Sequence, residues 1–134
     1  HPALSPDGRW LAYTSDESGV DEIYIRPFPL RGGKWQVSTS GGRWSRWGPN
    51  GKELFYLNPE GTLMVAQIEP GEKSLKVGQI DSLSQISTAS LTGIYGYTYD
   101  VTPDGQRFLV IEATEQGEAS LITVVVNWTA ELEK

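Results

Sequence analysis

Cysteine is absent from this chain of 134 residues, and histidine occurs once, as His1. Without cysteine there is no disulfide, no Fe–S cluster, no thiolate zinc site and no cysteine nucleophile. A single terminal histidine argues against a Ser-His-Asp triad and against a two-histidine metal site. These absences predict that the chain is not an enzyme and that it holds no metal and no cofactor.

Basic residues are also scarce, 11 against 17 acidic ones, so the formal net charge is −6. A negative chain lacks the positive face that nucleic acid and anionic membranes require, so we expect neither as a partner. No apolar run is long enough for insertion into a bilayer, and the first residues do not resemble a signal peptide. The length corresponds to about one domain.

A proline-centred turn signal occurs three times, and the segments around it align without gaps. The three blocks are Ala3–Tyr13, Arg46–Tyr56 and Asp100–Val110. Their prolines are 43 and then 54 residues apart, so the second unit carries 11 extra residues. Each block has proline, then Asp or Asn, then glycine, which is the chemistry of a tight hairpin turn. A period in the low forties is typical of a four-stranded propeller blade.

Short apolar strands follow these turns. We expect strands at Leu11–Tyr13, Glu22–Arg26, Lys34–Ser38, Leu54–Tyr56, Thr62–Ile68, Lys76–Ile80, Phe108–Ile111 and Leu121–Val126. The runs after the turns barely alternate between apolar and polar residues, which indicates strands covered on both faces. Lys34–Ser38 is predicted to be an exposed outer strand.

The predicted fold is therefore an all-β propeller segment of three four-stranded blades, with the third lacking its outer strand. Blade one covers 1–40, blade two covers 41–93 with an insertion at 69–93, and blade three covers 94–134.

Three blades do not close a ring, because closed propellers have four to eight. Each end of an open wedge would leave about 600 Å² of apolar surface bare, which at about 25 cal/mol per Å² is ~15 kcal/mol of missing burial. That exceeds the stability of a typical domain. We therefore expect a half-ring that a second copy completes as a six-bladed propeller, or that the missing blades of a parent chain complete.

The turn blocks also carry a family resemblance. Ser5–Gly8, Gly48–Gly51 and Thr102–Gly105 resemble the S-P-D-G signature of TolB-type, WD40-like (PD40) propeller repeats. Asp21–Pro29 and Thr123–Leu132 are similar to the C-terminal propeller region of large bacterial proteins, which often carry a serine/threonine kinase domain. The resemblance implies a bacterial parent protein and a periplasmic or extracytoplasmic location. No kinase motif is present in this chain.

The function expected from these features is a non-catalytic binding platform that recognises a protein or peptide. The alternative is the gating part of a prolyl-oligopeptidase-type serine peptidase, whose G-x-S-x-G motif is absent here. A propeller lyase or glycosidase would need channel-facing acids, histidines or metal ligands, and only Asp100 is near the predicted channel.

Two segments that connect an outer strand to the next inner strand supply the candidate ligand site. Its residues are Arg43, Trp44, Arg46, Tyr95, Tyr97, Tyr99 and Asp100. Arginines and aromatic rings at a channel rim suit an acidic or polar ligand, although packing between blades would use the same residues. Four acidic residues crowd another loop, but their spacing does not match a calcium loop: Asp16, Glu17, Asp21 and Glu22. Three tryptophans are expected in the core: Trp10, Trp47 and Trp128.

Overall fold

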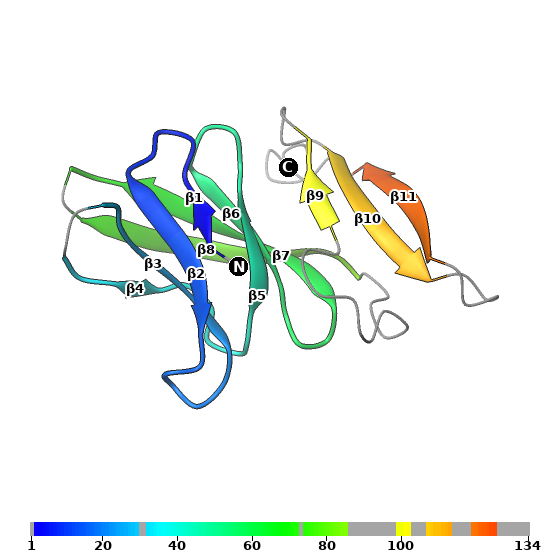
Figure 1. The fold of residues 1–134 in the computed structure, drawn as a ribbon, viewed down its shortest axis with the longest axis horizontal. Helices are drawn as coiled ribbons and strands as arrows, with labels where there is room; N and C mark the ends of the chain where they lie inside the picture. Colours follow the sequence, from blue (N-terminus) through cyan, green and yellow to red (C-terminus); the bar gives the residue numbers. More distant parts are fainter. Residues whose placement is uncertain are drawn as a thin grey trace.

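The computed structural model describes residues 2–29, 32–72, 74–85, 99–102, 107–113 and 119–125. Every regular element within these ranges is a β-strand, which confirms the predicted all-β class. The strands form three antiparallel sheets, shown in Figure 1. In the same ranges we find no helix of the length and apolar character that a membrane span requires.

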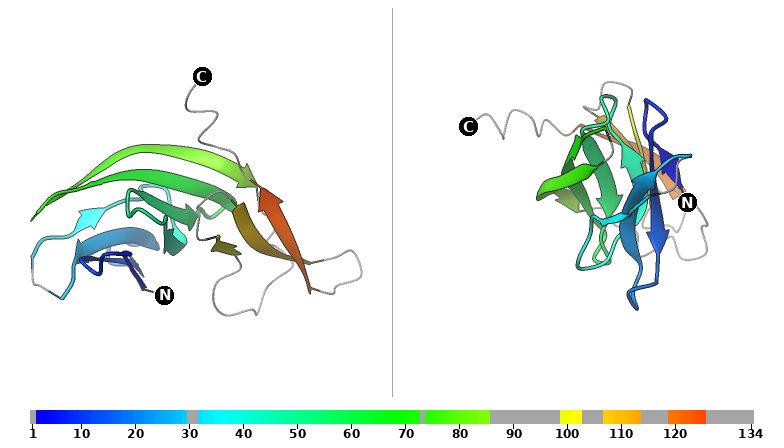
Figure 2. Two further views of the ribbon diagram at one scale, coloured as in Figure 1. Left: turned by 90° about the horizontal axis from the view of Figure 1, so that it is seen from above. Right: turned by 90° about the vertical axis from the view of Figure 1, so that its left-hand side faces the viewer.

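In each sheet, strands that are consecutive in the chain lie side by side and antiparallel. The first sheet contains β1 (Ala3–Leu4), β2 (Trp10–Ser15), β3 (Glu22–Pro27) and β4 (Trp35–Gln36). The middle sheet contains β5 (Arg43–Trp47), β6 (Glu53–Leu57), β7 (Thr62–Pro70) and β8 (Leu75–Gln85). The third sheet contains β9 (Tyr99–Val101), β10 (Arg107–Ala113) and β11 (Ala119–Val125). The left view of Figure 2 places the first strands, β1, β5 and β9, on one side of the molecule and the long β7–β8 hairpin on the other.

The turn chemistry expected from the repeated blocks is confirmed at the first two. Asp7 Oδ1 accepts the Arg9 backbone N–H at 3.1 Å, and Asn50 Oδ1 accepts the Lys52 N–H at 3.0 Å. The glycine that follows each of them has a positive φ, 76° and 72°. Asn50 thus takes the role that Asp7 has in the first block. The third turn, at 103–106, lies outside the described residues.

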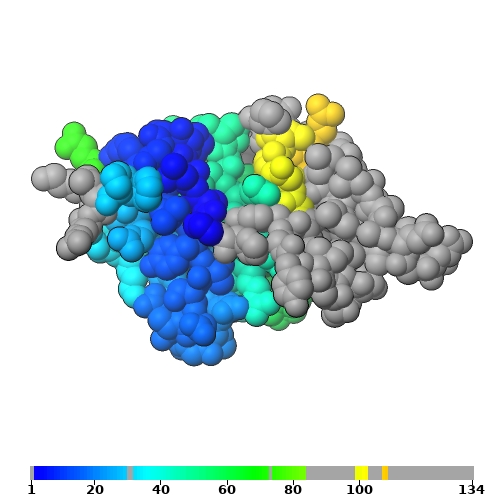
Figure 3. All heavy atoms as spheres, in the orientation of Figure 1, coloured from blue at the N-terminus to red at the C-terminus, as the bar shows by residue number. Residues whose placement is uncertain are grey.

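Two apolar clusters cover the two faces of the middle sheet. The cluster toward the first sheet contains Trp10, Ala12, Ile23, Ile25, Val37, Leu54, Tyr56, Ala66, Ile68 and Leu75. The cluster toward the third sheet contains Phe55, Leu57, Leu63, Val65, Tyr99 and Phe108. In Figure 3 the side chains of the first sheet, in blue, lie directly beside those of β5 and β6. The expectation of strands buried on both faces therefore holds for β6, where Leu54 to Leu57 are all buried.

The expected core tryptophans take different places. Trp10 is 3% exposed, and its ring meets Trp35 edge to face at 5.7 Å. Trp47 is half-buried, and its indole N–H donates to the Ala3 carbonyl at 2.9 Å, so that it joins the first two sheets. Trp128 lies outside the described residues.

The prediction of an exposed outer strand at Lys34–Ser38 was wrong in its second half. Strand β4 contains only Trp35 and Gln36, while Val37 and Ser38 are 2% and 1% exposed. Val37 packs in the first cluster, and Ser38 is bonded to the start of β3. The chain turns inward here because it must reach the next inner strand.

The outer part of the middle sheet is longer than the sequence indicated. Strand β7 continues to Pro70, the Gly71 N–H donates to the Ser74 carbonyl at 2.8 Å, and β8 runs from Leu75 to Gln85. The predicted strand Lys76–Ile80 is therefore the first half of β8. Two parts of these predictions lie outside the described residues. They are residues 86–93 of the proposed insertion, and residues 126–134, where the outer strand of the third unit was expected to be missing.

Candidate functional site

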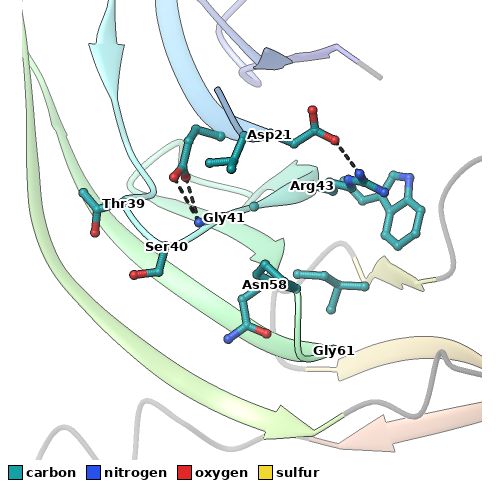
Figure 4. A pocket seen from close by; sticks show the side chains of 13 residues that line it. Asp21, Thr39, Ser40, Gly41, Arg43, Asn58 and Gly61 are labelled. Carbon is teal, nitrogen blue, oxygen red and sulfur yellow. Dashed lines mark hydrogen bonds and ion pairs between the residues drawn. The ribbon is translucent and has the colours of Figure 1, made fainter. Parts of the chain in front are cut away.

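A cavity of about 680 Å³ opens at one edge of the junction between the first and middle sheets (Figure 4). Its walls are the start of β3, the β4–β5 connection, the start of β5 and the β6–β7 turn. We call it the loop-side cavity, and it is lined by Val20, Asp21, Glu22, Thr39, Ser40, Gly41, Gly42, Arg43, Trp44, Leu57, Asn58, Pro59 and Gly61. Its volume lies in the range of small-molecule sites, about 300–1,000 Å³.

An ion pair lies at this cavity. Arg43 Nη2 is 2.6 Å from Asp21 Oδ2, and the two side chains are 61% and 33% exposed. An ion pair this exposed contributes little to folding, because water screens it. An arginine has five N–H donors, so Arg43 retains hydrogen-bonding capacity for a bound molecule beside its contact with Asp21.

A buried carboxylate holds the β4–β5 connection that forms the cavity wall. Glu22 is 2% exposed and accepts the Gly41 N–H at 3.0 Å through Oε1 and at 3.1 Å through Oε2. The Ser38 hydroxyl also donates to Glu22, while its oxygen accepts the Ile23 N–H at 2.8 Å. One carboxylate and one hydroxyl therefore fix both ends of the connection to the first sheet.

Two glycines give that connection its path. Gly41 has a φ of 96°, and a Cβ there would lie 2.4 Å from Pro59 Cγ. A Cβ on Gly42 would lie 2.9 Å from Ile23 Cγ1 and from Ser38 Oγ. Both positions therefore require glycine, because the backbone passes directly against neighbouring side chains.

Trp44 has the backbone of a strained residue. Its φ is 55°, a left-handed value that is an outlier for a bulky side chain. The register of β5 against β6 shifts between Arg43 and Arg46, which is the signature of a β-bulge. The Tyr99 hydroxyl, from the third sheet, donates to the Trp44 carbonyl. Strain of about 1–3 kcal/mol persists only where the surroundings enforce it, so Tyr99 helps to hold the bulge.

Arg46 and Asp100 lie at a different place. Arg46 Nε is 3.5 Å from Asp100 Oδ1, and both line a shallower hollow of about 410 Å³ along β1, β5 and β9. The structure thus divides the predicted site between two places: Arg43 and Trp44 line the loop-side cavity, while Arg46 and Asp100 follow the first strands. Tyr99 is 3% exposed and packs in the second cluster. Tyr95 and Tyr97 lie outside the described residues, and a ligand-binding role for the set stays a prediction.

The acidic residues that the sequence places in one loop also have different surroundings in the structure. Glu17 pairs with Lys34, Asp21 with Arg43, and Glu22 is buried. The Glu22 carboxylate also acts on its surroundings, because burial, and secondarily that charge, raise the pKa of Tyr56 to about 12. No sequence signal singled out Glu22, Ser38 and Gly41 as a unit, since they are 16 and 19 residues apart in the chain.

The fold has relatives of known structure. Comparison of the sequence with protein-family models gives no match, and comparison with curated proteins gives none. A solved structure from Bacteroides uniformis is similar with a TM-score of 0.53 and 19% identity over 94% of this chain and 40% of that chain. A second, from Bacteroides fragilis, has a TM-score of 0.52 and 17% identity over 94% of this chain and 38% of that chain. Both are provisionally named 6-phosphogluconolactonases.

These likenesses show that the fold is propeller-like, and this chain spans about 40% of the solved structures. They also correct two expectations, namely that the protein is a non-catalytic platform and that it is not an enzyme. Both of these structures carry an enzyme name, so missing motifs do not show that the chain is non-catalytic. The lack of a G-x-S-x-G motif and of any histidine beyond His1 argues against Ser-His-Asp triad chemistry, and it says nothing about other hydrolytic chemistry. The peptidase alternative gains no support from these structures either.

Proposed function

We propose that the chain is part of a propeller-fold hydrolase, and that the loop-side cavity binds its substrate, a phosphorylated sugar lactone or a close analogue. The observation that carries the proposal is the exposed Arg43–Asp21 ion pair at a cavity of small-molecule size. The names of the two similar structures reported above suggest the substrate class.

The ion pair offers the two groups that lactone hydrolysis needs. The Asp21 carboxylate accepts a proton from a water molecule whose oxygen attacks the lactone carbonyl carbon. The Arg43 guanidinium stabilises the negative charge that develops on the carbonyl oxygen. The ring C–O bond then breaks, the leaving oxygen takes the proton back, and the product is the open-chain hydroxy acid.

Other lining groups suit the rest of such a substrate. Thr39, Ser40 and Asn58 supply hydroxyl and amide groups for sugar hydroxyls, and all three lie on the cavity wall. Trp44 offers an aromatic surface to an apolar sugar face. A negative substrate gains from Arg43, whose fork of N–H donors suits phosphate and carboxylate oxygens.

We also propose that the three sheets are consecutive blades of one ring. The repeated order of strands within the sheets supports this arrangement, and so does the similarity to propeller-like structures of which this chain spans about 40%. The chain would then supply fewer than half of the blades. The boundaries at 40 and 93, and the resemblance to TolB-type repeats, stay predictions.

The test is hydrolysis of 6-phosphogluconolactone, followed by trapping the remaining lactone with hydroxylamine and correcting for spontaneous hydrolysis. We expect the protein to accelerate the loss of lactone, and Asp21→Asn or Arg43→Gln to remove the acceleration. Matched controls are Asp7→Asn and Arg9→Gln, an exposed pair in the β1–β2 turn at the opposite end of the same sheet. A rate equal to the spontaneous one, or equal losses in the control variants, would overturn the proposal.

Binding is measured separately on protein labelled with 5-fluorotryptophan. We expect 6-phosphogluconate, the hydrolysis product, to shift the fluorine signal of Trp44 and to leave that of Trp10 unchanged, because Trp10 is buried between the sheets. Gluconate without the phosphate is the control for the charge. If it binds equally well, the phosphate is not part of what Arg43 recognises.

A further inference from the structure

Arg43 and Trp44 are consecutive residues at the start of β5, and both line the loop-side cavity. In a regular strand, consecutive side chains point to opposite faces of the sheet, so the two would not reach the same cavity. The pairing of β5 with β6 is irregular here. Opposite Tyr56 of β6, strand β5 has two residues, Trp44 and Ser45. A β-bulge of this kind re-aims a side chain, and it explains how Arg43 and Trp44 come to line one cavity.

The bulge requires an unfavourable backbone at Trp44. Its φ of 55° is in the left-handed region, which a bulky L-residue disfavours. Such a conformation persists only where the surrounding structure holds it, and it is typical of functional sites. The Trp44 side chain is half-buried against the second apolar cluster, to which Tyr99 of the third sheet belongs. The third sheet is therefore in a position to hold the strained residue.

The Tyr99 hydroxyl provides a direct restraint, because it donates to the Trp44 carbonyl. Tyr99 is 3% exposed and shares the second cluster with the fully buried Phe108, so packing fixes its ring. The next residue of β9, Asp100, has its Oδ1 3.5 Å from Arg46 Nε at the far end of the bulge. That ion pair is partly exposed and screened by water, so it contributes little. The Tyr99 hydroxyl is therefore the β9 group that bonds the strained residue itself.

Tyr99 acts on the cavity from outside it. In the part of the chain that the structure describes, the residues lining the cavity come from the first two sheets and their loops, and none comes from the third sheet. Any effect of Tyr99 on a molecule bound in the cavity must therefore pass through Trp44.

We propose that Tyr99 is a positioning residue of the loop-side cavity. Its hydroxyl keeps the Trp44 backbone left-handed, so that the Trp44 indole and the Arg43 guanidinium contact the same ligand. The third sheet thus takes part in a site that the first two sheets build. The inference rests on the proposed function for its ligand, a phosphorylated sugar lactone or the acid formed from it.

The anchoring of Arg43 gives the loss of the Tyr99 hydroxyl a distinctive effect. Arg43 is held before the bulge, by its ion pair with Asp21 and by its register with Leu57 (Figure 4). Release of Trp44 therefore leaves the Arg43–Asp21 pair in place. An aromatic contact with the sugar is made equally in the substrate complex and in the transition state, so its loss raises KM and leaves kcat unchanged.

The first measurement needs no ligand. In protein labelled with 5-fluorotryptophan, Tyr99→Phe should move the Trp44 fluorine signal, which is assigned by its loss in Trp44→Phe. The Trp10 signal should stay in place, because Trp10 packs in the first cluster. Removal of one hydroxyl keeps the ring in the second cluster, so the variant keeps its fold, which circular dichroism checks. The matched control is Tyr24→Phe, a buried tyrosine, 5% exposed, that does not line the cavity and should leave the Trp44 signal unchanged.

The second measurement compares affinity with turnover. Tyr99→Phe should weaken the binding of 6-phosphogluconate and of gluconate by the same factor, about two- to tenfold, because the aromatic contact is lost and the phosphate contact with Arg43 is kept. The KM for 6-phosphogluconolactone should rise by a similar factor at constant kcat. Arg43→Gln should instead remove the difference in affinity between the two acids.

Four results would overturn the inference: an unchanged Trp44 signal in Tyr99→Phe, a changed signal with unchanged affinities, a fall in kcat at constant KM, or equal effects in Tyr24→Phe. Failure of the hydrolase proposal is recognised separately, as binding of 6-phosphogluconate without acceleration of lactone hydrolysis. The fluorine signal and the two affinities then still decide the role of Tyr99. If the wild type binds neither acid, the cavity has no such ligand and both proposals are wrong.

Discussion

Replacing Gly42 by alanine tests whether the wall of the loop-side cavity is built as tightly as the geometry indicates. The new Cβ would lie 2.9 Å from Ile23 Cγ1, 2.9 Å from Ser38 Oγ and 3.0 Å from Tyr56 Cδ2. All three neighbours are buried, 0%, 1% and 3% exposed, so none moves away into water. Overpacking of a core by one such group costs about 1–3 kcal/mol.

The assay is equilibrium unfolding in urea, followed by tryptophan fluorescence. With a denaturant slope of about 1–3 kcal/mol/M for a small protein, a loss of about 2 kcal/mol lowers the midpoint by about 1 M. The slope itself should stay the same, because the change affects stability and not the surface exposed on unfolding.

Gly33→Ala is the matched control. A Cβ on Gly33 meets nothing within 4 Å, and Gly33 has no positive φ. Alanine there should leave the midpoint unchanged or raise the free energy of unfolding by about 0.4–1 kcal/mol, because it restricts the unfolded chain. A Gly42→Ala midpoint equal to that of the wild type, or an equal drop in Gly33→Ala, would refute the reasoning.

Three further predictions concern groups around the site. Tyr99→Phe removes the hydroxyl that binds the Trp44 carbonyl but keeps the ring, so thermal unfolding should show a loss of about 0.5–1.5 kcal/mol. Ser38→Ala leaves the buried Ile23 N–H without its acceptor, so urea unfolding should show a loss of about 1–3 kcal/mol. Because the folded-state pKa of Tyr56 is raised to about 12, the free energy of unfolding should fall as the pH rises from about 10 to 12. Tyr56→Phe should reduce that fall, and equal pH slopes in the two proteins would contradict the assignment.

The parts of the fold that the sequence predicted well depend on local chemistry. The turns at Asp7 and Asn50 follow from contacts within four residues, and their glycines provide the positive φ that closes the turn. The strands β2, β3, β6, β7, β10 and β11 follow from apolar runs bounded by turn residues. Such signals are contained in short segments, so they can be read without the tertiary structure.

The parts that were missed depend on contacts between distant segments. Ser38 was expected to be exposed, but it is buried because Glu22, 16 residues earlier, folds against it. The length of β8 was underestimated, because Gly78 and the serines after it weaken the strand pattern in the sequence. In the structure, pairing with β7 outweighs this weak local preference and extends the strand. The left-handed backbone of Trp44 has no sequence signal, since tryptophan disfavours it and a hydroxyl of the third sheet helps to hold it.

The candidate site was only partly predicted for the same reason. Arg43 and Trp44 were selected because the sequence pattern placed them where an outer strand connects to the next inner strand, and in the structure they are the first residues of β5. Asp21, which pairs with Arg43, was noticed as one member of an acidic loop, and its pairing could not be inferred from spacing. Charged residues on neighbouring loops meet only once the sheets have stacked.

The long β7–β8 hairpin has a consequence for how such proteins change over time. Strands β7 and β8 have 9 and 11 residues, whereas β3 and β4 have 6 and 2. The additional length lies on the side of the molecule opposite β1, β5 and β9, as the left view of Figure 2 shows. Insertions on the β7–β8 side can therefore accumulate while β1, β5 and β9 keep their alignment, which leaves that side free to diverge between relatives.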